Sequence, residues 1–241
     1  MKTRKGNERG FLLFESLLAL AFFLVLILSS IEFFASARML FFKLYDTQTD
    51  KENALAALEK LRSDVHQAGE GLQFSVSLGL AEGIEVAGGS LILKSAAAAA
   101  VLSEEARAGQ SVLKIDNGAD FTAGRPIFLA DKNKGEALVT ASVEGNSLIL
   151  TAPIVFDYIK GEGTVALAQT VSYYLDEDRS TLRRRVNSGI AQPVLEGVQA
   201  FAAGLSADGR LVSAGIRLMT SPDVPREMTV VPKNLALLKG P

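Results

Sequence analysis

The chain has 241 residues, 48% of them hydrophobic, and a formal net charge of −2. This charge argues against a nucleic-acid-binding surface spread over the protein, because such surfaces carry a marked excess of Lys and Arg. The absence of cysteine excludes disulfides and thiolate metal sites.

Residues 11–34 are predicted to form a membrane-spanning helix. From position 11 to 31 the sequence reads FLLFESLLALAFFLVLILSSI, with Glu15 as its only charged residue before Glu32. About 20 apolar residues in a helix cross the roughly 30 Å hydrocarbon core of a bilayer, so this run is long enough. The preceding residues, MKTRKGNERG, are rich in Lys and Arg. Short basic segments stay cytoplasmic, so we expect the remainder of the chain to be extracytoplasmic.

Three simpler interpretations of this segment stay open: a secretory signal, a plain membrane anchor and the core helix of a soluble protein. The segment Ala35-Ser36-Ala37 resembles a signal-peptidase site, but the apolar region of a secretory signal is usually about 7–15 residues, shorter than this run. A plain anchor has no use for Glu15, because an ionisable side chain in hydrocarbon costs about 2.5–3.5 kcal/mol or more. Glu15 therefore indicates a partner.

The order of Gly10, Phe11 and Glu15 at the start of a long apolar helix resembles the N-terminus of type IV prepilins. The resemblance implies that a prepilin peptidase cuts between Gly10 and Phe11 on the cytoplasmic side, removes the leader 1–10 and methylates the new amine of Phe11. It also implies that Glu15 neutralises the amine of a neighbouring subunit during assembly and has no catalytic role.

Two departures from the family favour a minor pilin or a secretion pseudopilin over a major pilin. Glu32 occupies the region where many major pilins carry a helix-kinking proline, and the chain has no cysteine for the C-terminal disulfide of major pilins. The resemblance implies a single-pass protein stored in the inner membrane and then incorporated into a pilus or pseudopilus.

Residues 35–69 are predicted to extend the helix as an amphipathic segment. Leu55, Leu58, Leu61 and Val65 recur at three- and four-residue spacing, with charged residues, Asp64 among them, between them. We expect this stripe to cover a sheet. The helix should end at Gly69 and Gly71, because glycine readily adopts the left-handed conformation that terminates helices. His66, in the last turn, is not expected to have a catalytic or metal-binding role.

Residues 70–241 are predicted to form a β-rich head, which gives an α+β, pilin-like fold class. The segments Val171–Tyr174 and Gly215–Met219 should belong to the antiparallel sheet under the helix. Short strands separated by glycine-containing turns predict a small all-β insert at residues 104–168. Asp116, Asp120 and Asp131 lack the ligand alternation of a calcium loop and are interpreted as turn residues. The stretch Ala96–Ala100 fits either a short helix or a surface loop.

The region after the insert is similar to the heads of PilW-type minor pilins and J-type pseudopilins. The similarity rests on a strand with paired tyrosines, a turn, Leu182-Arg183-Arg184, and then Pro193–Val198. The run Arg183-Arg184-Arg185 is interpreted as a solvated strand, because alternate side chains point to opposite faces and an acidic turn precedes them.

These features together predict a minor pilin or pseudopilin subunit of a type IV pilus or related secretion pseudopilus, in a tip or initiation complex. The expected partners are other pilins or pseudopilins, the prepilin peptidase and, before assembly, membrane lipid; nucleic acid is not indicated. An alternative is a membrane-anchored binding module, such as an adhesin or a DNA-uptake tip protein. No cofactor is expected. An envelope enzyme is less favoured, because no nucleophile, acid–base pair or phosphate loop stands out.

Overall fold

The computed structural model describes the backbone of residues 8–236 and the side chains of residues 14–235. Residues 1–7 of the expected leader lie outside the described residues. The chain divides into two compact units, residues 1–51 and residues 52–241. The first unit is helical and the second contains all the described strands, so the fold is α+β, as expected.

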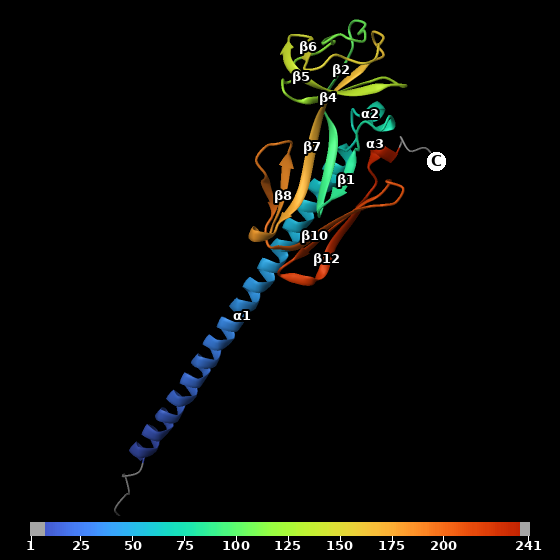
Figure 1. Cartoon of the computed structure of the whole chain (residues 1–241). Helices are drawn as coiled ribbons and strands as arrows, with labels where there is room; N and C mark the ends of the chain where they lie inside the picture. The colour runs from blue at the N-terminus through green and yellow to red at the C-terminus, as the bar shows by residue number, and fades with distance from the viewer. Residues whose placement is uncertain (1–7, 237–241) are drawn as a thin grey trace, which may run out of the picture. The chain divides into compact units, whose positions relative to one another are not determined.

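Helix α1 runs without interruption from Glu8 to Gln67 (Figure 1). No Gly or Pro occurs between positions 11 and 68, so nothing in the sequence breaks its backbone hydrogen bonds. It ends where two glycines follow: Gly69 and Gly71 have φ angles of 78° and 70°. The expected helix end is confirmed. The Asn234 side chain donates hydrogen bonds to the carbonyls of His66 (3.0 Å) and Ala68 (3.4 Å), two acceptors that the helix leaves unpaired.

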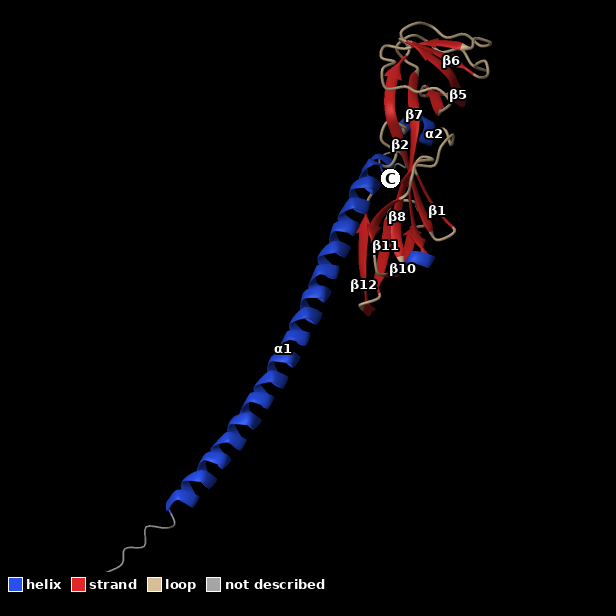
Figure 2. Cartoon of the chain, turned by 90° about the vertical axis from the view of Figure 1, so that its left-hand side faces the viewer, coloured by secondary structure: helices blue, strands red, loops and turns tan. Residues whose placement is uncertain are grey.

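The remaining elements lie in the second unit, which consists mainly of strands with a few short helical elements (Figure 2). The helical elements are α2 (Gln73–Ser77), the 3₁₀ turn η1 (Glu177–Arg179) and α3 (Lys233–Ala236). The strands are β1 (Ile84–Ala87), β2 (Ser90–Val101), β3 (Val112–Lys114), β4 (Pro126–Ala130), β5 (Gly135–Glu144), β6 (Ser147–Leu150), β7 (Thr164–Asp176), β8 (Thr181–Val186), β9 (Gln192–Leu195), β10 (Val198–Leu205), β11 (Val212–Leu218) and β12 (Ser221–Val230).

The longest strands, β2 and β7, pair with each other (Figure 1). Both contribute residues to two hydrophobic cores. At one end they continue the order β1-β2-β7-β8-β9. At the other end they continue the order β2-β7-β4-β5-β6-β3, and β3 returns to β2 through a bridge between Leu102 and Ile115. Hydrogen bonds from Ser103 N to Lys114 O and from Asp116 N to Val101 O complete this ring. Closure leaves this part without an open strand edge.

The ring of strands, called the barrel below, has a hydrophobic core of its own. This core includes Leu113, Ile127, Leu148 and Leu167, each at most 1% exposed. The barrel contains β3 to β6, which lie within the expected insert 104–168. Its core also uses Ala100 and Leu102, which precede that segment, and the start of β7 is part of it. The separability of the insert stays a prediction.

The second core lies between α1 and the sheets of the head. Leu61 and Val65, both fully buried, pack in one cluster with Leu91, Val171 and Tyr173 of the first sheet and with Val212 and Ala214 of the three-stranded sheet β10-β11-β12. Leu58 is also buried, as expected. Leu55 is 57% exposed, so its expected burial is wrong; the buried positions on that part of the helix are Ala54 and Ala57. The contacting face is therefore rotated from the predicted one.

The expected single sheet is two sheets. Val171–Tyr174 lies in β7 of the first sheet, whereas Gly215–Leu218 lies in β11 of the second, and Met219 follows β11 and is 54% exposed. Sequence periodicity identifies strands but carries no information on which sheet each strand joins.

The segment Ala96–Ala100 is neither a helix nor a loop but part of β2, paired with Val165–Ala168 of β7. Alanine has little intrinsic preference for strands, so the packing of this segment against β7 and other neighbouring residues determines its strand conformation. The glycine at position 71 lies so close that a Cβ there would be 2.6 Å from the Cβ of Ala96. A side chain at position 71 would therefore clash with Ala96, so position 71 requires glycine.

Candidate functional site

The first candidate site residues, Gly10 and Phe11, lie in the first turn of α1, which begins at Glu8. Their backbone is helical, and their side chains are outside those described. The first turn is the weakest part of a helix, because its N–H groups have no intrahelical acceptor, and Gly disfavours helix by about 1 kcal/mol relative to Ala. The peptide bond between Gly10 and Phe11 is therefore at a position where local unwinding costs little.

Glu15 lies one helical turn after Phe11 on the same side of α1, about 6 Å along the axis at 1.5 Å per residue. Its side chain is exposed, and no ion pair joins it to another described side chain. It is surrounded in sequence by apolar residues. A carboxylate in this setting requires a cation or hydrogen-bond donor from outside the described residues if it enters a membrane.

The side chains of residues 14–46 are all exposed, and most are large and apolar. Phe22, Phe23 and Leu26, for example, are 58–65% exposed. An apolar surface of this size is normally covered by lipid or by other protein. The helix is long and apolar enough to cross a membrane as a single span. Glu32 is on the same exposed helix.

His66 lies in the last turn of α1, as the sequence indicated. Its backbone carbonyl accepts a hydrogen bond from the Asn234 side-chain amide, so His66 takes part in capping the C-terminus of the helix. Within the described residues, no group of three or more His, Asp or Glu side chains is arranged to hold a metal ion. Asp131 accepts hydrogen bonds from the amides of Asn133 and Lys134 in its own turn, as interpreted from the sequence, whereas Asp116 accepts the amide of Val101 at the end of β2.

The three consecutive arginines of β8 have different environments. Arg183 pairs with Asp176 across the acidic turn (2.7 Å), and Arg185 lies over the ring of Tyr174 and donates to its hydroxyl (2.8 Å). These two share one face, as strand alternation predicts. Arg184 points the other way. The interpretation of a solvated strand is wrong for Arg183 and Arg184, whose side chains are 16% and 17% exposed, and holds for Arg185, which is exposed.

Arg184 belongs to a buried polar network that sequence analysis missed. The Asp64 carboxylate of α1 accepts hydrogen bonds from the Arg184 Nε (2.6 Å) and from the Tyr173 hydroxyl (2.7 Å). Asp64, assigned to the polar side of the helix from its position, is 5% exposed. Burial and the Asp64 carboxylate raise the pKa of Tyr173. Burial alone would lower the pKa of Arg184, but Asp64 outweighs it and raises that pKa. The network joins the helix to two strands.

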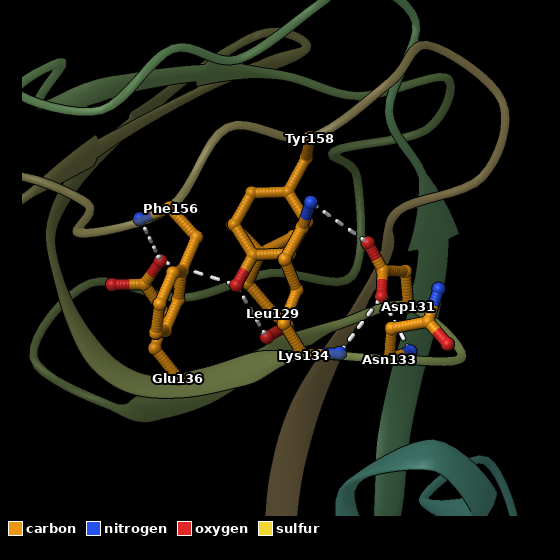
Figure 3. Close-up of polar contacts among 7 residues, drawn as sticks. All are labelled: Leu129, Asp131, Asn133, Lys134, Glu136, Phe156 and Tyr158. Atoms are coloured by element: carbon orange, nitrogen blue, oxygen red, sulfur yellow. Dashed lines mark hydrogen bonds and ion pairs between the residues drawn. The ribbon is translucent and has the colours of Figure 1, made fainter.

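A second buried carboxylate, Glu136 of β5, stabilises a loop of the barrel (Figure 3). It accepts hydrogen bonds from the amides of Val155 (2.9 Å) and Phe156 (3.4 Å) and from the hydroxyl of Tyr158 (3.1 Å). Tyr158 is 1% exposed, and burial followed by the Glu136 charge raises its pKa. Both networks are structural. The spacing of hydrophobic residues predicts which face of a helix or strand is buried. It does not show that a carboxylate on the buried face, such as Asp64 or Glu136, has a hydrogen-bond donor elsewhere in the chain.

Comparison with protein-family models and with curated proteins finds no match. Among solved structures, the gp54 tailspike of Acinetobacter baumannii bacteriophage AP22, in complex with A. baumannii capsular saccharide, aligns with 32% of this chain and 15% of the tailspike chain. The aligned residues are 12% identical and the TM-score is 0.28. A likeness at this level carries no conclusion about fold or ligand.

Proposed function

We propose that the chain is a prepilin-like subunit, a minor pilin or secretion pseudopilin that is stored in the inner membrane and then built into a type IV pilus or pseudopilus. One observation carries the proposal: Gly10, Phe11 and Glu15 follow a basic segment and open an exposed apolar helix of membrane-spanning length. The head supports it secondarily, because an amphipathic continuation of the same helix packs on antiparallel sheets.

Cleavage between Gly10 and Phe11 converts the amide nitrogen of Phe11 into an α-amine, which is a cation near neutral pH. That cation begins a helix whose following side chains are apolar. An unpaired charge in a low-dielectric setting is strongly disfavoured, so the amine needs a counter-charge in an assembled filament. Glu15 is the nearest carboxylate along the helix after the cut and would supply this counter-charge to a neighbouring subunit.

In this role Glu15 affects membrane insertion and filament assembly in opposite ways. Membrane insertion does not need Glu15, since a carboxylate in hydrocarbon is unfavourable. Assembly does need it. The proposed partners are therefore similar subunits that present their own amines, together with the prepilin peptidase. Methylation of the Phe11 amine by that peptidase keeps the positive charge.

The test is Glu15→Gln, which removes the charge at nearly constant volume. We expect normal membrane level and normal cleavage, but reduced incorporation into sheared filaments or reduced co-purification with partner pilins. Glu32→Gln, about five turns further along the same exposed helix, is the matched control and should assemble normally. Assembly of Glu15→Gln at the wild-type level would refute the counter-charge role.

A further inference from the structure

We propose that Arg38 binds the phosphate of an anionic lipid headgroup at the membrane surface where α1 leaves the bilayer. This role of Arg38 depends on the proposed function for the membrane span and its direction. It adds to that function a lipid-binding residue beyond the span and the chemical class of lipid that this residue selects.

Arg38 lies among aromatic side chains and has no carboxylate beside it. On a helix, side chains three and four positions apart are neighbours. For Arg38 these neighbours are Phe34, Ala35, Phe41 and Phe42. The guanidinium lies over the Phe42 ring, 5.5 Å from its centroid, which attracts the cation but leaves its charge unpaired. Within residues 14–235, no ion pair joins Arg38 to a carboxylate.

The nearest acidic residues along α1 are too distant to pair with Arg38. Glu32 and Asp46 are six and eight positions away, about 9 and 12 Å along the helix axis. Between these two acids the only charged residues are Arg38 and Lys43, so this segment is basic. Lys43 has Asp46 three positions after it, within reach on the helix surface. Arg38 therefore needs an anion from outside the helix, whereas Lys43 does not.

The position of Arg38 on α1 brings its guanidinium to the lipid headgroups. A span that begins at Phe11 needs about 20 residues to cross the hydrocarbon core, so it ends near Ile31. Arg38 lies about 10 Å further along the helix, and the headgroup layer is about 5–8 Å thick. Helical side chains lean toward the N-terminus, which is toward the bilayer here, and a long Arg side chain extends further in that direction.

The chemistry around Arg38 fits a phospholipid better than a soluble anion. A guanidinium presents its N–H donors in a planar fork that matches two phosphate oxygens at once. The surrounding rings of Phe34, Phe41 and Phe42 are exposed, and such rings suit the boundary between headgroups and acyl chains. A soluble anion would use the cation but not the rings. Zwitterionic lipids carry their own cation beside the phosphate, so an anionic lipid should bind more tightly.

The test follows the NMR signal of the Arg38 Nε–H group in the full chain, held in uncharged maltoside micelles. The signal is assigned by its loss in Arg38→Gln. The probes are phosphatidylglycerol and, separately, phosphatidylcholine with the same acyl chains. We expect a saturable shift with phosphatidylglycerol at an affinity about fivefold higher than with phosphatidylcholine, the ratio that corresponds to about 1 kcal/mol for a basic residue near an anionic surface. The Arg184 Nε–H signal, hydrogen-bonded to Asp64, should not move.

Two matched variants on α1 show whether one residue or basic charge in general is responsible. Native mass spectrometry should show fewer retained phosphatidylglycerol molecules per chain for Arg38→Gln than for the wild type, and an unchanged number for Lys43→Gln. Glutamine is a good helix former, so both variants should keep α1 helical. The basic residues of segment 1–10 are present in all three proteins and do not affect the comparison.

Three results would overturn the lipid site. The first is an Arg38 signal that does not move with phosphatidylglycerol or moves equally with both lipids. The second is equal lipid loss in Arg38→Gln and Lys43→Gln. The third is a signal that moves only when a partner subunit is added, which would make the occupant a protein. Lipid binding in micelles requires neither cleavage after Gly10 nor filament assembly, so the lipid site and the proposed function fail separately.

Discussion

Removing the Glu136 carboxylate should destabilise the barrel selectively. This side chain is 8% exposed and accepts hydrogen bonds from the amide of Phe156 and the hydroxyl of Tyr158 (Figure 3). It also accepts one from the amide of Val155. Glu136→Ala deletes all three interactions and puts no new acceptor in their place.

The magnitude follows from the donors that lose their acceptor. A buried donor without a partner costs about 1–3 kcal/mol, and such costs are not additive within one network. The Tyr158 hydroxyl keeps a long contact to the Leu129 carbonyl at 3.5 Å, and the Phe156 contact is weak at 3.4 Å. We therefore expect a loss of about 3 kcal/mol for Glu136→Ala. Glu136→Gln, whose amide oxygen still accepts, should cost about 1 kcal/mol.

The assay is native-state hydrogen exchange on the full chain, which reports the opening free energy of each amide. Amides of the barrel core, such as Leu138 and Leu148, should lose protection, whereas those of Val212 and Ile216 in the other sheet should keep it. Glu144→Ala, an exposed carboxylate at the end of the same strand, is the control and should change little. Equal loss of protection in both sheets would refute a separable barrel, and a loss below about 1 kcal/mol would refute the role assigned to Glu136.

Two further predictions concern the helix and a turn. Leu61→Ala should lower the free energy of unfolding by about 2–5 kcal/mol because Leu61 is fully buried, whereas Leu55→Ala should change it by less than about 0.5 kcal/mol because Leu55 is 57% exposed. Thermal denaturation followed by circular dichroism measures both changes. Similar effects of the two substitutions would contradict the observed buried face of the helix. Burial opposes ionisation of Asp131, but the amides of Asn133 and Lys134 outweigh it and hold its pKa below the usual value. The ionised form therefore stabilises the fold above the unfolded pKa of about 3.9, and this contribution is lost as the pH falls through the folded pKa. The stability difference between wild type and Asp131→Asn should shrink below about pH 4, and a difference independent of pH in that range would contradict this cause.

Local signals in the sequence predicted much of the helix. The absence of Gly and Pro predicted an unbroken helix, and Gly69 and Gly71 predicted its end, because each signal acts through the backbone of the residue itself. The buried face was predicted only in part. Leu55 repeats with the correct spacing, but the packed stripe passes through the alanines at 54 and 57 instead.

Features that depend on partners distant in sequence were not predictable from local patterns. Ala96 lies in a strand because it pairs with Ala168 of β7, far away in the sequence. Asp64 is buried because Tyr173 and Arg184, more than 100 positions away, provide donors. The closure of the barrel rests on the bridge between Leu102 and Ile115 and on the backbone hydrogen bonds beside it, none of which has a sequence signature.

The most direct test of the central proposal is the mass of the N-terminal peptide of the protein isolated from its native membrane. The proposal predicts a chain that begins at Phe11 and carries one methyl group on its amine. It also predicts that replacing Gly10 with a bulky residue leaves residues 1–10 attached. A chain that begins at Arg38, after Ala35-Ser36-Ala37, or one that keeps residues 1–10 in the wild type, would contradict it.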